Sequence, residues 1–266
     1  MKKILYALSV IVLSVILYSC YKNPITGRST LNLVDESTMR EMANREYVAF
    51  LSTNRPVTGT RDAEMVQRVG QRLASSVQSY LSSKGQTELI SGYQWQFNLV
   101  NNNQANAWCM PGGKVVVYSG LMPLVQNEAG LAVVMGHEIA HAIARHSNER
   151  VSQQLAAQYG SQALGGLLGS NPGAASAIFN AAVGIGAQGL LLKYSRDQET
   201  EADQMGLIFM AMAGYNPNEA IAFWQRMSAQ GGSKPPEILS THPSDSRRIN
   251  DIRRFIPTAM QYYKPR

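Results

Sequence analysis

The motif HEIAH at residues 137–141 constrains the fold of this chain more than any other feature of the sequence. It lies inside a strongly helical stretch, residues 128–151, for which Asn127 is the predicted N-cap. Four residues advance an α-helix by about 400°, so His137 and His141 project from one face, one turn apart. The motif therefore predicts one metal ion held by both imidazoles.

The residue types of this motif favour zinc and hydrolysis. Neutral imidazole nitrogens are common zinc ligands, and Glu138 beside them can take a proton from a metal-bound water and pass it to a leaving amine. A chance match, with both histidines satisfied by hydrogen bonds, is the competing interpretation. The apolar residues inside the motif and an acidic helix downstream argue against it. We expect one Zn²⁺ per chain and peptide-bond hydrolysis.

The motif leaves the third metal ligand open. His146 lies nine positions after His137, or about 900° along a continuous helix, which directs it to the opposite face. It also misses the HExxHxxGxxH pattern, whose last position is Ser147 here. We therefore expect a structural role for His146.

An acidic segment, residues 195–203, supplies better candidates, although acidic residues are also favourable at a helix N-terminus without any metal. Glu199 and Asp203 are four residues apart and share one face of the predicted helix. Glu199 can reach the metal while Asp203 accepts the second N–H of a liganding imidazole. Glu201 is turned about 200° from Glu199 and is the second choice for the third ligand.

The N-terminus has the layout of an export signal. Two lysines precede an apolar run, residues 4–18, which is shorter than the ~20 residues that span a membrane. The run leads into LYSC at residues 17–20, which resembles a bacterial lipobox, although its tyrosine is bulky for one. We expect removal of residues 1–19 and a lipid on Cys20. An uncleaved anchor and an ordinary signal cleavage are the alternatives.

The rest of the chain is long enough for one domain. Residues 20–34, with a turn at residues 23–27, are expected to form an extended tether between the lipid and a domain of residues 35–266. With Cys20 carrying the lipid, Cys109 has no disulfide partner, and we expect Cys109 to be a buried residue of a strand. The formal net charge of +6 comes with no dense Lys/Arg run outside the C-terminal helix, so nucleic-acid binding is not indicated.

Hydrophobic periodicity predicts an α+β fold that is mostly helical. Apolar residues at helical spacing mark helices at 37–51, 61–82, 218–229 and 244–255. A two-residue period from Tyr93 to Leu99 and a strand from Lys114 to Ser119 predict a small antiparallel sheet. The Ala-, Gly- and Leu-rich stretch 156–192 predicts two close-packed helices, with a membrane-touching lid as the alternative.

The strand that begins at Lys114 is also a candidate for substrate binding, because it directly precedes the motif helix. We expect its edge to hold an extended peptide beside the metal through backbone hydrogen bonds, with an ordinary core hairpin as an equally weighted alternative. Such binding depends on backbone more than on sequence and suits unfolded polypeptides. The residues of this edge are Lys114, Val115, Val116 and Val117.

Three segments resemble the M48 family of zinc peptidases: HEIAH at 137–141, ETEAD at 199–203 and NAWCMPGGK at 106–114. The resemblance extends from Asn23 to about Arg248 and is closest to the family's exported, soluble-domain branch. It implies a zincin-like metalloprotease fold, with Glu199 as third ligand and Asp203 behind it. It also implies unfolded or misfolded envelope proteins as substrates.

The resemblance gives His242 a second interpretation besides a loop residue before the last helix. Some relatives place a histidine from this region on the zinc as a fourth ligand, which closes the site until it moves away. The competing function is a zinc-bearing lipoprotein that binds clients or assembly factors without cutting them, a role that would not need Glu138. In either case we expect a lipid-anchored protein of the bacterial cell envelope, on the outer membrane facing the periplasm, which could work with a protein partner.

Overall fold

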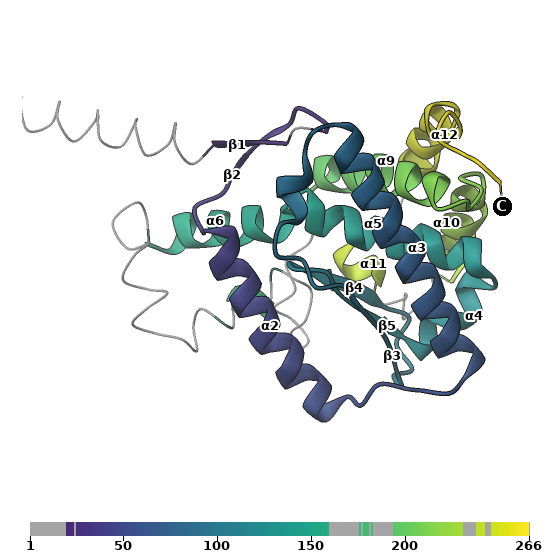
Figure 1. The fold of residues 1–266 in the computed structure, drawn as a ribbon, viewed down its shortest axis with the longest axis horizontal. Coiled ribbons are helices and arrows are strands. Elements are labelled where there is room, and N and C mark those ends of the chain that lie inside the picture. Colours follow the sequence, from purple (N-terminus) through teal and green to yellow (C-terminus); the bar gives the residue numbers. More distant parts are fainter. Residues whose placement is uncertain are drawn as a thin grey trace, which may run out of the picture.

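The structure, a computed structural model, describes residues 20–23, 25–159, 176, 178–180, 182, 194–230, 238–242 and 246–265 (Figure 1). Its helices are α2 (Glu36–Thr53), α3 (Arg61–Ser83), α4 (Met122–Val125), α5 (Glu128–Ile143), α6 (His146–Tyr159), α9 (Arg196–Met212), α10 (Glu219–Ala229), α11 (Ile238–Thr241) and α12 (Ser246–Met260). Its strands are β1 (Cys20–Lys22), β2 (Ser29–Leu31), β3 (Gln96–Val100), β4 (Ala107–Met110) and β5 (Lys114–Tyr118). The mostly helical α+β class is confirmed, and α2, α3, α10 and α12 match the four helices expected from periodicity.

The main sheet is mixed, with the order β3-β5-β4. We expected β3 and β5 to be antiparallel, and this was wrong: β5 runs parallel to β3 and antiparallel to β4. The reason is β4, which lies between them in sequence and forms a tight hairpin with β5. Gly112 and Gly113 turn this hairpin at φ 88° and 83°, a region that glycine adopts without strain.

The expectation that Lys114, Val115, Val116 and Val117 form an open edge was also wrong. β5 is the central strand, so its backbone groups pair with β3 on one side and β4 on the other. All of its residues are buried, because helices cover both faces of the sheet. Within the residues that the structure describes, β4 has a strand partner on one side alone, and α5 packs against it.

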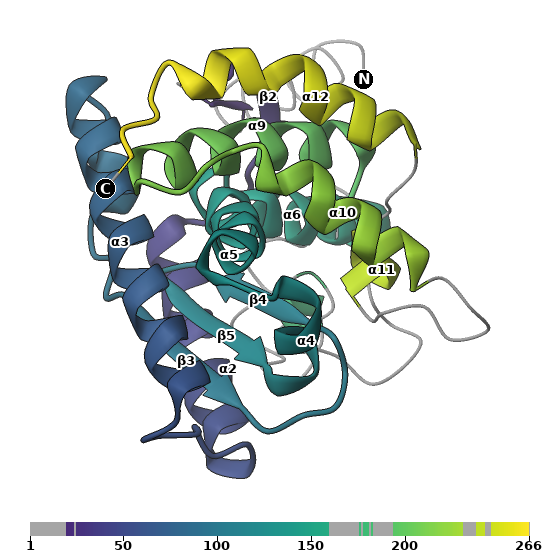
Figure 2. The ribbon, with the colours of Figure 1, turned by 90° about the vertical axis from the view of Figure 1, so that its right-hand side faces the viewer.

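Helix α5 lies between the sheet and α9, and α12 lies on the far side of α9 (Figure 2). Two glycines allow α5 and α9 to approach closely. A Cβ atom at Gly206 would lie 2.9 Å from the backbone nitrogen of His137 and 3.0 Å from the carbonyl carbon of Gly136. Contacts this short with backbone atoms leave no room for a side chain, so glycine at this crossing brings the acidic residues of α9 against the motif.

The helix expected at 128–151 is broken in two. α5 ends at Ile143, and Arg145 adopts φ 60° before α6 begins at His146. The sequence contains no glycine or proline there, and the causes are tertiary contacts. The Arg145 guanidinium lies 4.4 Å from the ring centroid of Tyr21 and 3.6 Å from a carboxylate oxygen of Glu36. Helical periodicity carries no information on such contacts.

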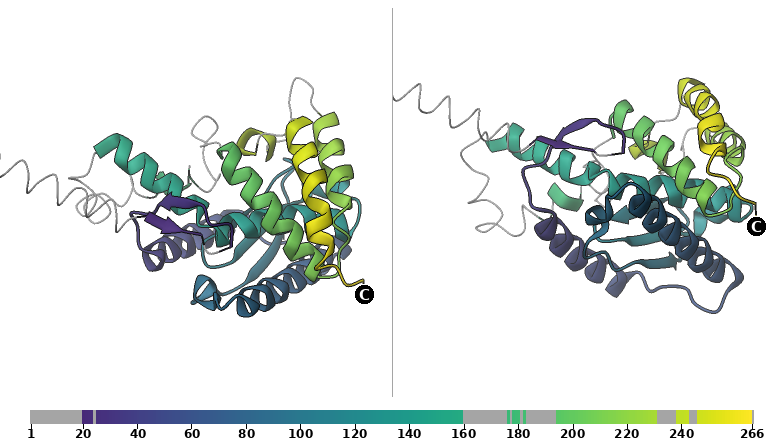
Figure 3. Two further views of the ribbon diagram at one scale, coloured as in Figure 1. Left: turned by 90° about the horizontal axis from the view of Figure 1, so that it is seen from above. Right: turned by 45° about the horizontal axis from the view of Figure 1, so that its top comes forward.

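The N-terminal segment is not a free tether. β1 and β2 form an antiparallel hairpin beside α6 (Figure 3). The expected turn is present, since the Gly27 N–H donates to the Asn23 carbonyl and the Asn23 N–H donates to that of Arg28, both at 2.8 Å. Asn23, however, is 1% exposed, and its side chain binds α9. The segment is therefore packed onto the domain that we expected to begin at residue 35.

Two other expectations concern residues that the structure does not describe. The signal peptide that we expect at residues 1–19 lies wholly outside the described part, and most of the Ala- and Gly-rich stretch 156–192 does too. In the part that is described, no helix combines the length and apolarity needed to cross a bilayer. Cys109 is a free, buried residue of β4, as expected.

Candidate metal centre

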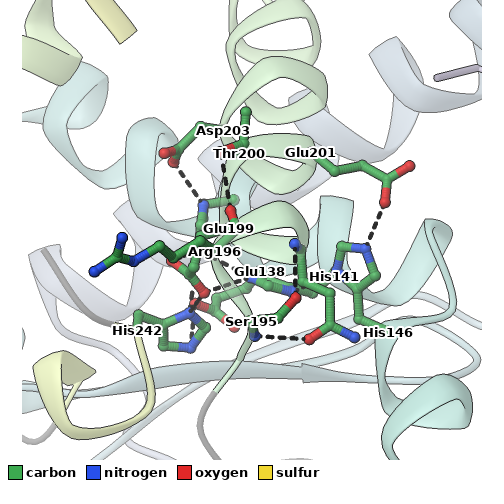
Figure 4. A network of polar contacts seen from close by, with 12 residues as sticks. Glu138, His141, His146, Ser195, Arg196, Glu199, Thr200, Glu201, Asp203 and His242 are labelled. Atoms are coloured by element: carbon green, nitrogen blue, oxygen red, sulfur yellow. Dashed lines mark hydrogen bonds and ion pairs between the residues drawn. The ribbon is translucent and has the colours of Figure 1, made fainter. Parts of the chain in front are cut away.

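Four buried side chains converge at the crossing of α5 and α9. His137 and His141 come from α5, Glu199 from α9, and His242 directly follows α11. Figure 4 labels His141, Glu199 and His242, which point toward one another. Each offers one ligand atom, and all four atoms lie within 4.8 Å of one another. The structure thus brings together every predicted ligand, including the residue considered as a fourth.

The local sequence explains how these residues are held. The Asn127 side chain accepts the Gly130 N–H and caps α5, as expected. Ser195 and Gln198 form a capping box at the start of α9, which fixes the turn that carries Glu199. His242 is held by its own backbone N–H, which donates to the Ile238 carbonyl at 2.8 Å.

The distances among these atoms fit a small tetrahedral ion. His137 Nε2 lies 3.0 Å from His141 Nε2, Glu199 Oε1 lies 3.4 Å from His141 Nε2, and His242 Nδ1 lies 2.8 Å from Glu199 Oε1. Ligands at about 2.1 Å from a tetrahedral zinc ion lie about 3.4 Å apart. Three imidazole nitrogens and one carboxylate oxygen are also a donor set that zinc accepts.

Glu138 faces the same space and has an unsatisfied oxygen. Its side chain is 3% exposed, and Oε1 is buried without a hydrogen-bond partner, 3.5 Å from His242 Nε2. Such an atom is costly unless it has a further partner, such as a water or a substrate group. Burial raises the pKa of Glu138, which makes it a better proton acceptor than an exposed glutamate.

Asp203 lies behind His137, as predicted. Its Oδ1 is 2.9 Å from His137 Nδ1, so the ring nitrogen that faces the ligand cluster is Nε2. This arrangement fixes the tautomer and orientation of a liganding imidazole. Although burial alone would raise the pKa of Asp203, Arg248 and His137 hold it below its usual value.

Arg248 is a component of the site that our sequence reasoning placed only in a basic helix. Its guanidinium donates to both Asp203 oxygens at 2.8 Å and lies 2.8 Å from Glu199 Oε2. The guanidinium carbon also lies 3.5 Å from the Trp224 ring centroid. Arg248 lies four residues before Ile252 and eight before Ile256, so its place on the apolar face of an amphipathic helix is the sequence signal that could have found it.

His146 and Glu201 form a second cluster on the other side of His141. His146 Nδ1 is 2.7 Å from His141 Nδ1, and His146 Nε2 is 2.9 Å from Glu201 Oε2. The break between α5 and α6 returns His146 toward the site, so its expected position on the opposite helix face was wrong. Glu201, our second choice for the third ligand, points away from the cluster that contains Glu199 (Figure 4).

Comparison with known proteins decides the family. Residues 60–256 match the family model described as Peptidase family M48. This chain belongs to peptidase family M48. The match runs from the start of α3 into α12, and it includes His137, Glu138, His141, Glu199, Asp203, His242 and Arg248.

Several curated relatives are similar to this M48 chain. It is 37% identical to the mitochondrial metalloendopeptidase OMA1 of Saccharomyces cerevisiae over 195 residues, which are 70% of this chain and 54% of that protein. It is 36% identical to the beta-barrel assembly-enhancing protease of Yersinia pestis over 165 residues, which are 60% of this chain and 34% of that protein. The M48 chain therefore spans about half the length of the first relative and a third of the second.

An aromatic ring that the sequence did not indicate, that of Tyr194, packs against two imidazoles of the site. The Tyr194 ring lies 3.8 Å from the His141 ring and 4.7 Å from the His242 ring, measured between centroids. The guanidinium carbon of Arg150 lies 3.5 Å from the centroid of the same Tyr194 ring. Tyr194 thus shields one side of the two imidazoles from water.

Proposed function

We propose that this chain is a zinc-dependent endopeptidase that hydrolyses peptide bonds in exported, unfolded or misfolded proteins of the cell envelope. The observation that carries the proposal is the buried carboxylate oxygen of Glu138, which has no hydrogen-bond partner and lies beside the four candidate ligands, 3.5 Å from His242 Nε2. A protein that only bound zinc would have no need of this costly group. The family membership and the relatives' metalloendopeptidase and protease names also support it.

The proposed roles follow from the geometry. His137, His141 and Glu199 would hold the zinc ion, and a zinc ion bound there would supply Lewis-acid chemistry to the scissile carbonyl and lower the pKa of an attacking water. Glu138 takes the proton of the attacking water and returns it to the leaving amine. Asp203 keeps the His137 proton on Nδ1, so that Nε2 remains available as a ligand.

The edge of β4 that lacks a strand partner among the described residues is the place that we propose for a substrate. Its residues lie against α5, and β5 occupies the opposite edge. An extended polypeptide paired with β4 would present its backbone to Glu138 without any requirement for a particular sequence. In the substrate-binding proposal, this edge of β4 replaces the edge of the Lys114–Tyr118 strand. Pairing with a strand edge requires an extended backbone, so we propose unfolded polypeptides as substrates.

The proposed location rests on the N-terminal sequence. Cleavage before Cys20 and a lipid on its sulfur would attach the domain to the bacterial cell envelope, with the outer membrane facing the periplasm as our assignment. One relative is a beta-barrel assembly-enhancing protease, a name that agrees with an envelope role. A protein partner could control access to the site.

The direct test is cleavage of an unfolded reporter protein by the full chain, purified in a mild detergent. We expect fragments to appear, to cease when zinc is removed with a chelator, and to return when one equivalent of zinc is added. A folded version of the same reporter serves as the control and should resist cleavage. If the chain binds one zinc and the reporter but never cuts it, the client-binding alternative replaces the endopeptidase.

His242 is proposed to act as a removable fourth ligand. Its Nδ1 lies 2.8 Å from Glu199 Oε1 and 3.2 Å from His137 Nε2, so it would supply a fourth ligand where a catalytic zinc site would keep one position open for water. We expect His242→Ala to lower zinc affinity by about tenfold or more, because a ligand is lost, while cleavage per bound zinc increases. Zinc competition titrations and cleavage rates normalised to bound zinc measure the two effects.

The neighbouring Ser240→Ala is the control for the His242 experiment, because it changes α11, the short helix directly before His242, at a residue outside the ligand cluster. It should match the parent in both measurements. Weaker zinc binding in His242→Ala without faster cleavage per zinc would show that His242 supports the site and does not close it.

A further inference from the structure

The Glu201 carboxylate collects hydrogen bonds from one short N-terminal stretch, residues 23 and 25–28, here called the leader turn. The donors are Asn23 Nδ2 at 2.7 Å, the Thr26 hydroxyl and Arg28 Nε. More than 170 positions separate these residues from Glu201 in sequence. Three converging donors on one carboxylate fix its orientation closely.

Glu201 transmits this orientation to His141 through one side chain. His146 lies between them, with Nε2 at 2.9 Å from Glu201 and Nδ1 at 2.7 Å from His141 Nδ1. A carboxylate can only accept, so His146 carries its proton on Nε2 and accepts from the Nδ1–H of His141. His141 Nε2 is then the deprotonated nitrogen, and it is the one that faces His137 and Glu199.

The surroundings show that this chain of contacts is built into the fold. The side chains of His146 and Glu201 are 0% and 3% exposed. Arg28 also binds both oxygens of Glu149 on α6 at 2.8 and 2.9 Å, and Gln198 of the α9 capping box donates to the same carboxylate at 2.7 Å. The leader turn therefore joins α6 to α9 at the point where Glu201 and His146 meet.

We propose that the leader turn is a positioning element of the metal centre: it orients His141 through Glu201 and His146, as Asp203 and Arg248 orient His137. The inference rests on the zinc-dependent function proposed above. The leader turn lies before residue 60, where the match to the family model begins, so the proposal adds residues outside that match to the metal centre. Undocking the leader turn would loosen one of the metal ligands.

Thr26→Val is the most selective test, because it removes one hydroxyl donor from Glu201 without changing the size of the side chain. Thr30→Val is a matched control in the same hairpin, since the Thr30 hydroxyl contacts the Tyr21 carbonyl at 3.4 Å and does not reach Glu201. In the full chain, zinc affinity would be measured by competition with a chromophoric chelator. The absorption spectrum of the cobalt-substituted protein reports ligand geometry, and the melting temperature of the metal-free protein reports folding.

We expect His146→Phe to weaken zinc binding by about 10- to 100-fold, the usual effect of losing a group that supports a ligand, and Thr26→Val to weaken it about threefold. His146→Gln, which can accept from His141 and donate to Glu201, should recover part of the loss. Both weakened variants should alter the cobalt spectrum, and Thr30→Val should not. Adding Thr26→Val to His146→Phe should cause little further loss, because both act through one route.

The outcomes separate this inference from the proposed function. Parent-like zinc affinity and cobalt spectra in both His146→Phe and Thr26→Val would overturn the positioning role while the parent still binds zinc and cuts. A parent protein that binds no zinc would refute the proposed function and, with it, this inference. If His146→Phe fails to fold, the comparison of Thr26→Val with Thr30→Val decides, and equal zinc affinities there refute the proposal.

Discussion

Glu138→Gln is expected to abolish cleavage of an unfolded reporter while leaving zinc binding intact. The amide has the shape of the carboxylate but cannot accept a proton from water, and a positioned acid–base group contributes about 10²- to 10⁴-fold to rate. Because Glu138 is not among the four candidate ligands, the bound metal should be unaffected. Reporter cleavage and zinc content, measured on the same full-chain preparation, test both statements.

Glu128→Gln provides a matched control, since it makes the same chemical change at the start of the same helix. Glu128 pairs with Arg68 and Arg72 at the surface, so its loss should have a small effect on stability and none on cleavage. A Glu138→Gln protein that holds one zinc and cuts at the parental rate would remove Glu138 from the mechanism.

Glu199→Gln is expected to lose both zinc and activity. The carboxylate contributes the only negative charge among the four candidate ligands, and a neutral amide oxygen is a much weaker partner for zinc. We expect zinc affinity to fall by at least about 100-fold, more than the loss of a supporting group causes, with cleavage falling in parallel. Addition of excess zinc should restore part of the activity if the fold is intact.

Asp197→Asn is the control for this change, because it removes an exposed carboxylate from the first turn of the same helix. It should retain zinc and activity, which separates the role of Glu199 as a ligand from a general effect of negative charge near the helix N-terminus. Unchanged zinc affinity in Glu199→Gln would mean that another residue is the third ligand.

The ligand set could be predicted from sequence because its geometry is local. Residues four apart on a helix share a face, which is enough to pair His137 with His141 and Glu199 with Asp203. The choice of Glu199 over Glu201 followed from the same rule, and the structure places these two carboxylates in different clusters. The helices were predictable for a similar reason, since each buries one stripe at helical spacing.

What could not be predicted depends on contacts between distant segments. We placed His146 on the wrong helix face because we assumed one unbroken helix. The helix ends before Arg145, whose side chain contacts Tyr21 and Glu36. The direction of β3 relative to β5 depends on β4, which lies between them in sequence. Both faces of β4 are covered, so its residues do not alternate between apolar and polar, and hydrophobic periodicity does not reveal the strand. Arg248 shares the buried face of α12 with Ile252 and Ile256, but only the packing of α12 on α9 brings its guanidinium to the metal centre.

If Cys20 carries a lipid, as proposed above, the short hairpin at the N-terminus limits how far the domain could work from the membrane. β1 begins at Cys20 itself, and Asn23 is already anchored on α9. Three residues of extended chain cover roughly 10 Å. With a lipid on Cys20, as we propose, the domain would rest against the bilayer surface, and the distance over which it could capture a polypeptide would be set by the size of the folded domain alone.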